Sequence, residues 1–126
     1  MMTKIAALAV TEPVSVDERR LHDIVNELGE VAATGLIQLA LEQMALAVRA
    51  LHEDARADNV LAITAQAERL SRLAWQVGLV TLAAVAIDIA ECARHGDAVA
   101  LEATLARLTR VADRSLTDIW DGVGPG

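Results

Sequence analysis

The sequence predicts an all-α fold, an antiparallel up-down four-helix bundle with a short additional N-terminal helix. Apolar residues make up 54% of the 126 residues but aromatic residues only 2%, so the core must consist of small aliphatic side chains, which suit closely packed helices. Both prolines, Pro13 and Pro125, lie near the ends, which leaves the middle of the chain free to be helical. Apolar residues recur three and four positions apart, as on one face of an α-helix.

Two helices are predicted before the centre of the chain. Ser15 and Glu18 have the spacing of a capping box, so they should begin a first helix that ends at Gly29. A second helix should cover Glu30–Asp54. It contains Gly35, and one glycine costs about 1 kcal/mol in a helix interior, which a long buried helix tolerates. The predicted inward-facing residues of the second helix are Val31, Leu36, Ile37, Ala40, Met44, Ala47, Val48 and Leu51.

The third predicted helix, Leu61–Gly78, organises the rest of the chain. Gly78 should end it, because glycine readily adopts the positive φ with which a chain leaves a helix. One face is an apolar stripe with alternating spacings of four and three: Ile63, Ala67, Leu70, Ala74 and Val77. Another face carries a second row at the same kind of spacing: Thr64, Glu68, Ser71, Arg72 and Trp75.

Two further helices complete the prediction. Leu79–Arg94 is the least amphipathic segment, with apolar residues spread around it. Asp97 should then cap a last helix that ends near Trp120, a residue expected to close the end of the bundle. The predicted seam of this helix is Leu101, Leu105, Leu108, Ala112, Ser115 and Ile119. Short turns between long helices make neighbours antiparallel. The chain therefore divides into a lead-in of residues 1–14, a bundle of residues 15–121 and a tail of residues 122–126.

Charge and composition argue against several classes of protein. The net charge is −7, with a single lysine and no basic cluster, which argues against a nucleic-acid partner. The single cysteine, Cys92, excludes an internal disulfide and weakly favours the cytosol. The longest uncharged stretch, Leu73–Ile87, is shorter than the roughly 20 residues that span a bilayer, and the apolar run Ile5–Val10 is short for a signal peptide. We therefore expect a cytoplasmic protein that does not enter a membrane.

The third predicted helix resembles the site helix of the histidine phosphotransfer (HPt) family. The family's pattern there is Ala-His-x-Leu-Lys-Gly-x-Ala-x-x-Leu-Gly, and this chain has Ala67-Glu68-Arg69-Leu70-Ser71-Arg72-Leu73-Ala74-Trp75-Gln76-Val77-Gly78. The order of predicted helices from Ser15 onward is also similar, as is the turn at Ala93-Arg94-His95-Gly96-Asp97. The resemblance implies a signalling module of a two-component phosphorelay, whose partners are response-regulator receiver domains or sensor kinases.

Three functional positions of the family differ in this chain. Glu68 stands where the resemblance implies the phosphoacceptor histidine, Ser71 where it implies a lysine, and Arg72 where it implies a small glycine. A carboxylate cannot replace imidazole as a nitrogen nucleophile, and its charge repels a phosphoryl group. The resemblance therefore implies a module that docks without carrying phosphate, is not an enzyme and needs no cofactor. Its expected partner-binding residues are Thr64, Glu68, Ser71, Arg72 and Trp75.

Several alternatives stay open. Glu68 and Arg72 have the i, i+4 spacing of an ordinary surface ion pair, and Trp75 could simply cover the end of the neighbouring helix. The chain could be an active phosphotransfer protein that uses a non-standard histidine, although His22, His52 and His95 all lack the family's frame. It could also be a structural dimer or adaptor unrelated to phosphorelay, because the second and fourth predicted helices carry more apolar surface than one core covers. We find no metal-ligand spacing, nucleophile–base pair or phosphate-binding loop.

Overall fold

The structure is a computed structural model that describes residues 13–123, without the side chains of residue 118 and residues 120–123. The helices in this range are α2 (Glu18–Leu28), α3 (Glu30–Arg56), α4 (Val60–Gln76), α5 (Val80–Arg94) and α6 (Ala98–Val123). The expectations for residues 1–12 of the lead-in, for the Trp120 side chain and for the end of the tail lie outside the described residues.

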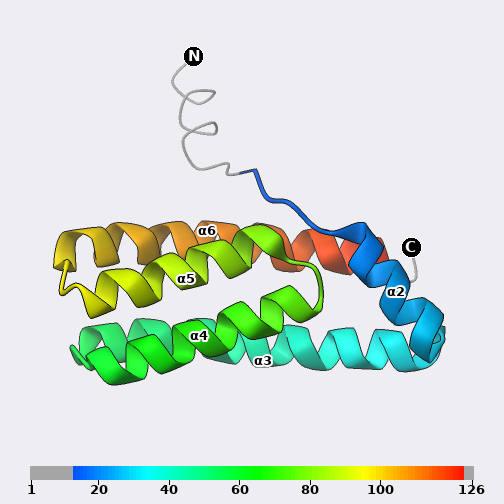
Figure 1. Cartoon of the computed structure of the whole chain (residues 1–126), viewed down its shortest axis with the longest axis horizontal. Coiled ribbons are helices and arrows are strands. Elements are labelled where there is room, and N and C mark those ends of the chain that lie inside the picture. The colour runs from blue at the N-terminus through cyan, green and yellow to red at the C-terminus, as the bar shows by residue number, and fades with distance from the viewer. Residues whose placement is uncertain (1–12, 124–126) are drawn as a thin grey trace, which may run out of the picture.

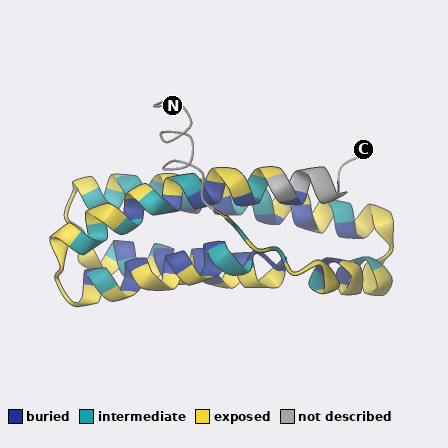
Figure 2. Ribbon diagram, turned by 90° about the horizontal axis from the view of Figure 1, so that it is seen from above, coloured by how far each residue is buried: buried dark blue, intermediate teal, exposed yellow. Residues whose placement is uncertain are grey.

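The four long helices form an antiparallel bundle, which confirms the predicted fold class. In Figure 1, α3 and α4 lie side by side in one layer, α5 and α6 form the other, and α2 crosses one end. The short connections predicted around residues 55–59, 78 and 95–97 join these helices. Figure 2 shows buried residues on the inner sides of the helices and exposed residues on the outside of the bundle.

The helices differ in length, and this difference gives α2 its place. α3 has 27 residues and α6 has 26, whereas α4 has 17 and α5 has 15. At about 1.5 Å per residue, α3 is about 40 Å long and α4 about 25 Å. The long pair therefore extends beyond the short pair at one end, and α2 packs there (Figure 1).

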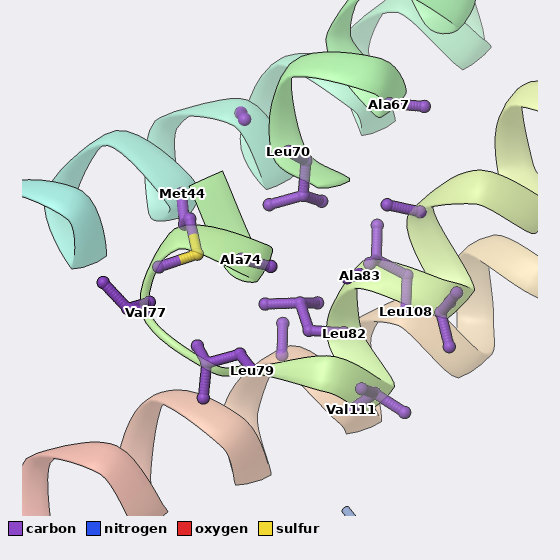
Figure 3. Close-up of a cluster of buried hydrophobic side chains, with 14 of the residues drawn as sticks. Met44, Ala67, Leu70, Ala74, Val77, Leu79, Leu82, Ala83, Leu108 and Val111 are labelled. Carbon is purple, nitrogen blue, oxygen red and sulfur yellow. The ribbon is translucent and has the colours of Figure 1, made fainter. Parts of the chain in front are cut away.

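The core lies along the axis of the bundle. Figure 3 shows its centre, where Met44 of α3, Leu70 of α4, Leu82 of α5 and Leu108 of α6 lie together. All five residues of the stripe predicted on α4 are buried. The predicted seam of α6 is also buried, except for Leu101, which is half-buried against the core. The prediction of a core without aromatic rings is confirmed for the described residues.

The inward face predicted for α3 is wrong at two positions. Val31 and Leu36 are exposed, at 90% and 46% of their surface. The buried residues repeat at spacings of four and three: Ala33, Ile37, Ala40, Met44, Ala47 and Leu51. Val31 and Leu36 lie outside this stripe, because a helix turns by about 100° per residue and the core covers one side only. The error came from assuming that large apolar residues are preferentially buried.

The start of α2 also differs from the prediction, because Ser15 is not its cap. The side chain of Asp17 accepts hydrogen bonds from the backbone N–H groups of Arg19 and Arg20. The Ser15 N–H instead donates to Thr81 Oγ1 over 2.8 Å. The segment ahead of α2 is thus held against the start of α5, and Asp17 is the N-cap of a helix that begins at Glu18.

Gly78 joins this N-terminal segment to the connection between α4 and α5. Its carbonyl oxygen accepts a hydrogen bond of 2.7 Å from the Asp17 N–H, next to an isolated β-bridge between Val16 and Leu79. Gly78 has φ of +79°, and a Cβ atom added there would lie 2.7 Å from the Asp17 carbonyl oxygen. Glycine is therefore required twice, for the backbone conformation and for the close contact.

Candidate functional site

The row predicted on α4 lies on its outer face, with one exception. The helix begins at Val60, and the side chain of its N-cap, Asn59, accepts a hydrogen bond of 3.2 Å from the Ala62 N–H. From there Thr64 is half-buried, while Glu68, Arg72 and Trp75 are exposed. Ser71, the remaining residue of the row, is buried, with only 6% of its surface exposed.

Ser71 is buried because it lies at the edge of α4 that meets α5. It follows the fully buried Leu70 and lines a pocket together with Ile87 and Ala90 of α5. Its hydroxyl group has no hydrogen-bond partner among the described residues, but it is not cut off from solvent, because Ser115 carries the one fully buried, unpaired side-chain oxygen among them. Ser71 therefore adds a hydroxyl group without a partner from the described residues to the lining of this pocket.

The carboxylate of Glu68 is paired with an arginine of another helix. Arg94 of α5 donates from its terminal nitrogen to Glu68 Oε1 over 2.7 Å, and the two side chains are 50% and 47% exposed. The i, i+4 pair that the sequence offered, between Glu68 and Arg72, does not form. Among the described residues Arg72 has no ion pair, so its guanidinium group stays available at the surface.

Two shallow pockets meet at this ion pair. One, of about 500 Å³, lies toward the N-terminal end of α4. The other, of about 250 Å³, lies between α4 and α5 over Ser71. Glu68, Arg72 and Arg94 line both of them. One carboxylate and two guanidinium groups therefore form a local excess of positive charge, in a chain whose net charge is −7.

Exposed apolar side chains surround this charged centre. Val60 and Leu61 lie at the first turn of α4, Trp75 at its last turn, and Ile87 on α5. Trp75 is 53% exposed, so about half of its surface is accessible to a partner. Protein interfaces combine buried apolar anchors, often Trp, with Arg side chains. The outer face of α4 and the adjoining edge of α5, called here the Glu68 face, have this composition.

The three histidines lie outside the Glu68 face. His22 is exposed on α2. On α3, His52 Nε2 lies 3.1 Å from Thr109 Oγ1 of α6. After the end of α5, His95 Nδ1 lies 2.8 Å from the carbonyl oxygen of Glu91. One ring nitrogen of both His52 and His95 is thus occupied by a hydrogen bond. Among residues 13–123 with described side chains, no group of three or more His, Cys, Asp or Glu is placed to hold a metal ion.

A second outer face, on α3, has a different character. It carries four exposed large apolar residues: Val31, Leu36, Leu39 and Leu46. By length and composition α3 could cross a membrane, with a mean hydropathy of 1.5 over its most apolar window, of which 28% is buried. A helix of a soluble bundle passes the same test, so this finding alone does not distinguish a membrane from a protein partner.

The arrangement of helices is similar to that of a known phosphotransfer protein. The crystal structure of histidine-containing phosphotransfer protein B from Pseudomonas aeruginosa PAO1 matches with a TM-score of 0.80, covering 86% of this chain and 93% of that chain. The chain has an HPt-like fold. The two sequences are 19% identical, so the similarity shows the fold alone. No protein-family model and no curated protein sequence matches the chain.

Sequence reasoning missed Arg94, Ile87 and Leu61 as parts of the Glu68 face. A signal for Arg94 and Ile87 existed, because the short connection at Gly78 makes α4 and α5 antiparallel neighbours. Ile87 and Arg94 are seven residues apart and therefore share a side of α5. Which side of α5 meets α4 was not readable, since apolar residues surround most of that helix.

Proposed function

We propose that this chain is a signalling module of a two-component phosphorelay that docks on receiver domains or sensor kinases without itself carrying phosphate. The observation that carries the proposal is Glu68. Within an HPt-like fold, this carboxylate is exposed midway along α4, at the position where the sequence resemblance puts the phosphoacceptor histidine. In this role the chain acts in the cytoplasm, has no catalytic activity and needs no cofactor.

The chemistry of the Glu68 face supports docking better than phosphate transfer. The Glu68 carboxylate is already paired with Arg94 and offers no nitrogen nucleophile. Arg72 lies beside it, exposed, where an approaching partner would meet its side chain. Two guanidinium groups at the centre favour an acidic partner surface, so docking does not depend on a metal ion to offset the charge of Glu68.

Binding to receiver domains and kinases from the source cell tests the proposal. Surface plasmon resonance should detect at least one of them, and Arg72→Glu should weaken that binding about tenfold or more because it reverses a central charge. Arg49→Glu, on the exposed side of α3, is the matched control and should leave binding unchanged. The proposal fails if no receiver domain or kinase binds.

Phosphate labelling separates docking from transfer. Incubation with a sensor kinase, its receiver domain and ATP should leave the chain unlabelled, and acid-labile label on His22, His52 or His95 would favour an active phosphotransfer protein instead. The variant Glu68→His with Arg72→Gly should acquire label, because it supplies an imidazole and an open approach. Ser71 stays unchanged in this design, since a lysine at that buried position would place a charge between two helices.

The second candidate is a structural dimer or adaptor with no phosphorelay partner. The observation that favours it is the α3 face, where Leu36, Leu39 and Leu46 are all about half exposed. Glu42 and Arg49 lie on the same exposed side of α3. If the α3 helices of two copies pack antiparallel, Glu42 of one copy can lie near Arg49 of the other. This candidate predicts a stable homodimer and no affinity for receiver domains.

A further inference from the structure

We infer that Arg72, Arg94 and Ser71 form a binding site for a phosphoryl group, and that Glu68 occupies this site until such a group replaces it. The inference rests on the proposed function, because it names what the Glu68 face recognises on a docked partner: a phosphorylated side chain. The chain would then bind the phosphoryl group without accepting it, and so distinguish a phosphorylated partner from an unphosphorylated one.

The first support is that hydrogen-bond donors converge on one place. Arg72 and Arg94 line both pockets, and Ser71 lines the smaller one, where its hydroxyl group makes no hydrogen bond to a described residue. Guanidinium groups bind phosphoryl oxygens through charge-assisted, often paired hydrogen bonds. A phosphoryl group has three such oxygens and can therefore use donors from α4 and α5 together.

The second support is that the site already holds an anion. The Glu68 carboxylate contacts Arg94 through one oxygen at 2.7 Å, at a place where both side chains are about half exposed. Ion pairs of this exposure are weak, so a competing anion can open the pair readily. A phosphoryl group carries nearly two negative charges at neutral pH, against one on Glu68, and it gains Arg72 as a second cation.

The third support is the contrast between Arg72 and the neighbouring Arg69. Arg69 is directed toward α3, where it donates to the side-chain oxygen of Gln43. Arg72, three residues later, has no such partner among the described residues. The guanidinium group of Arg72 is thus free to bind an anion between α4 and α5, whereas that of Arg69 is held elsewhere.

Inorganic phosphate is the first probe, because its binding does not require any partner protein. Titration at constant ionic strength should shift the NMR signals of the Arg72 and Arg94 side-chain N–H groups in a saturable way. Glu68→Gln should tighten phosphate binding about two- to fivefold, since it frees Arg94. Arg72→Gln and Arg94→Gln should each weaken it at least about fivefold, and Ser71→Ala about twofold. Arg49→Gln is the control with no expected effect.

The second probe is a receiver domain that binds the chain, tested with and without beryllofluoride as a phosphoryl mimic. The mimic should strengthen binding about tenfold, and Arg94→Gln should abolish this ratio between the affinities with and without the mimic, even where it also weakens binding of the unmodified domain. Equal shifts across all arginine side chains, or phosphate binding unaffected by Arg72→Gln and Arg94→Gln, would overturn the inference.

If phosphate binds at Arg72 and Arg94 but no receiver domain or kinase binds, the site stands and the proposed phosphorelay function fails. If a receiver domain binds equally with and without the mimic and phosphate does not bind, only the inference fails.

Discussion

Two neighbouring helices, α3 and α4, use the same pattern inside the bundle and opposite chemistry outside it. Each buries a stripe of apolar residues at spacings of four and three. The outer face of α4 has Glu68 and Arg72 at its centre, together with Arg94 of α5. The outer face of α3 instead presents leucines, among them Leu39 and Leu46.

This difference separates the requirements of folding from those of binding. One side of each helix is set by the core, because only apolar side chains of suitable volume pack there. The outer side of each helix does not have to pack into the core, so its composition indicates which kind of partner it binds. The polar α4 face fits a charged, selective partner, while the α3 face fits an apolar one. Four predictions test whether the two faces are as distinct as this comparison claims.

The largest effect should come from the buried side. Leu70→Ala on α4 removes a fully buried side chain and should lower the free energy of unfolding by about 2–5 kcal/mol. Leu46→Ala on α3 removes a side chain that is 55% exposed, so its effect should be about 0.5 kcal/mol or less. Urea denaturation at low protein concentration measures both. Similar losses for the two variants would mean that the α3 face contributes to the fold of a single chain.

The two glycines should respond to alanine with opposite signs. Gly78→Ala should lower the free energy of unfolding by about 2–4 kcal/mol, because φ is positive and the new Cβ meets the Asp17 carbonyl oxygen. Gly35→Ala should raise it by about 0.5–1 kcal/mol, since Gly35 is helical and no atom lies within 4 Å of an added Cβ. Thermal unfolding ranks the variants against the parent chain. A stabilising Gly78→Ala would contradict the role given to that residue.

Self-association should depend on α3 and not on α4. Light scattering over a concentration series should show a dimer, and Leu39→Glu with Leu46→Glu should raise its dissociation constant about tenfold or more, because charges would enter an apolar contact. Leu61→Glu, on the Glu68 face, is the control and should leave the dimer intact. A parent chain that stays monomeric at high concentration refutes self-association.

The smallest effect should come from the Glu68–Arg94 ion pair. Because both side chains are about half exposed, a double-mutant cycle with Glu68→Gln and Arg94→Gln should give a coupling of about 0.5 kcal/mol or less. This coupling should fall further in 1 M salt, where exposed charges are screened. A coupling above about 2 kcal/mol would assign the pair a structural role and weaken the view that a partner's anion replaces Glu68.

Most of the fold could be predicted from the sequence alone. Helical periodicity, the glycines at residues 29, 78 and 96 and the absence of proline from the interior specify where helices run and end, because these signals act within a few residues. The stripe on α4 was predicted without error for the same reason. The resemblance around Glu68 also led to the expectation of an HPt-like fold, which the chain has.

The contacts between side chains of different helices could not be predicted, because they depend on how the helices pack against one another. The sequence could not pair Glu68 with Arg94, since that contact depends on the rotation of α5 against α4. Nor could it show that Ser71 is buried, because Ser71 lies near the boundary between the inner and outer sides of α4. Spacing defines a stripe, but the width and direction of that stripe depend on the neighbouring helices that cover it.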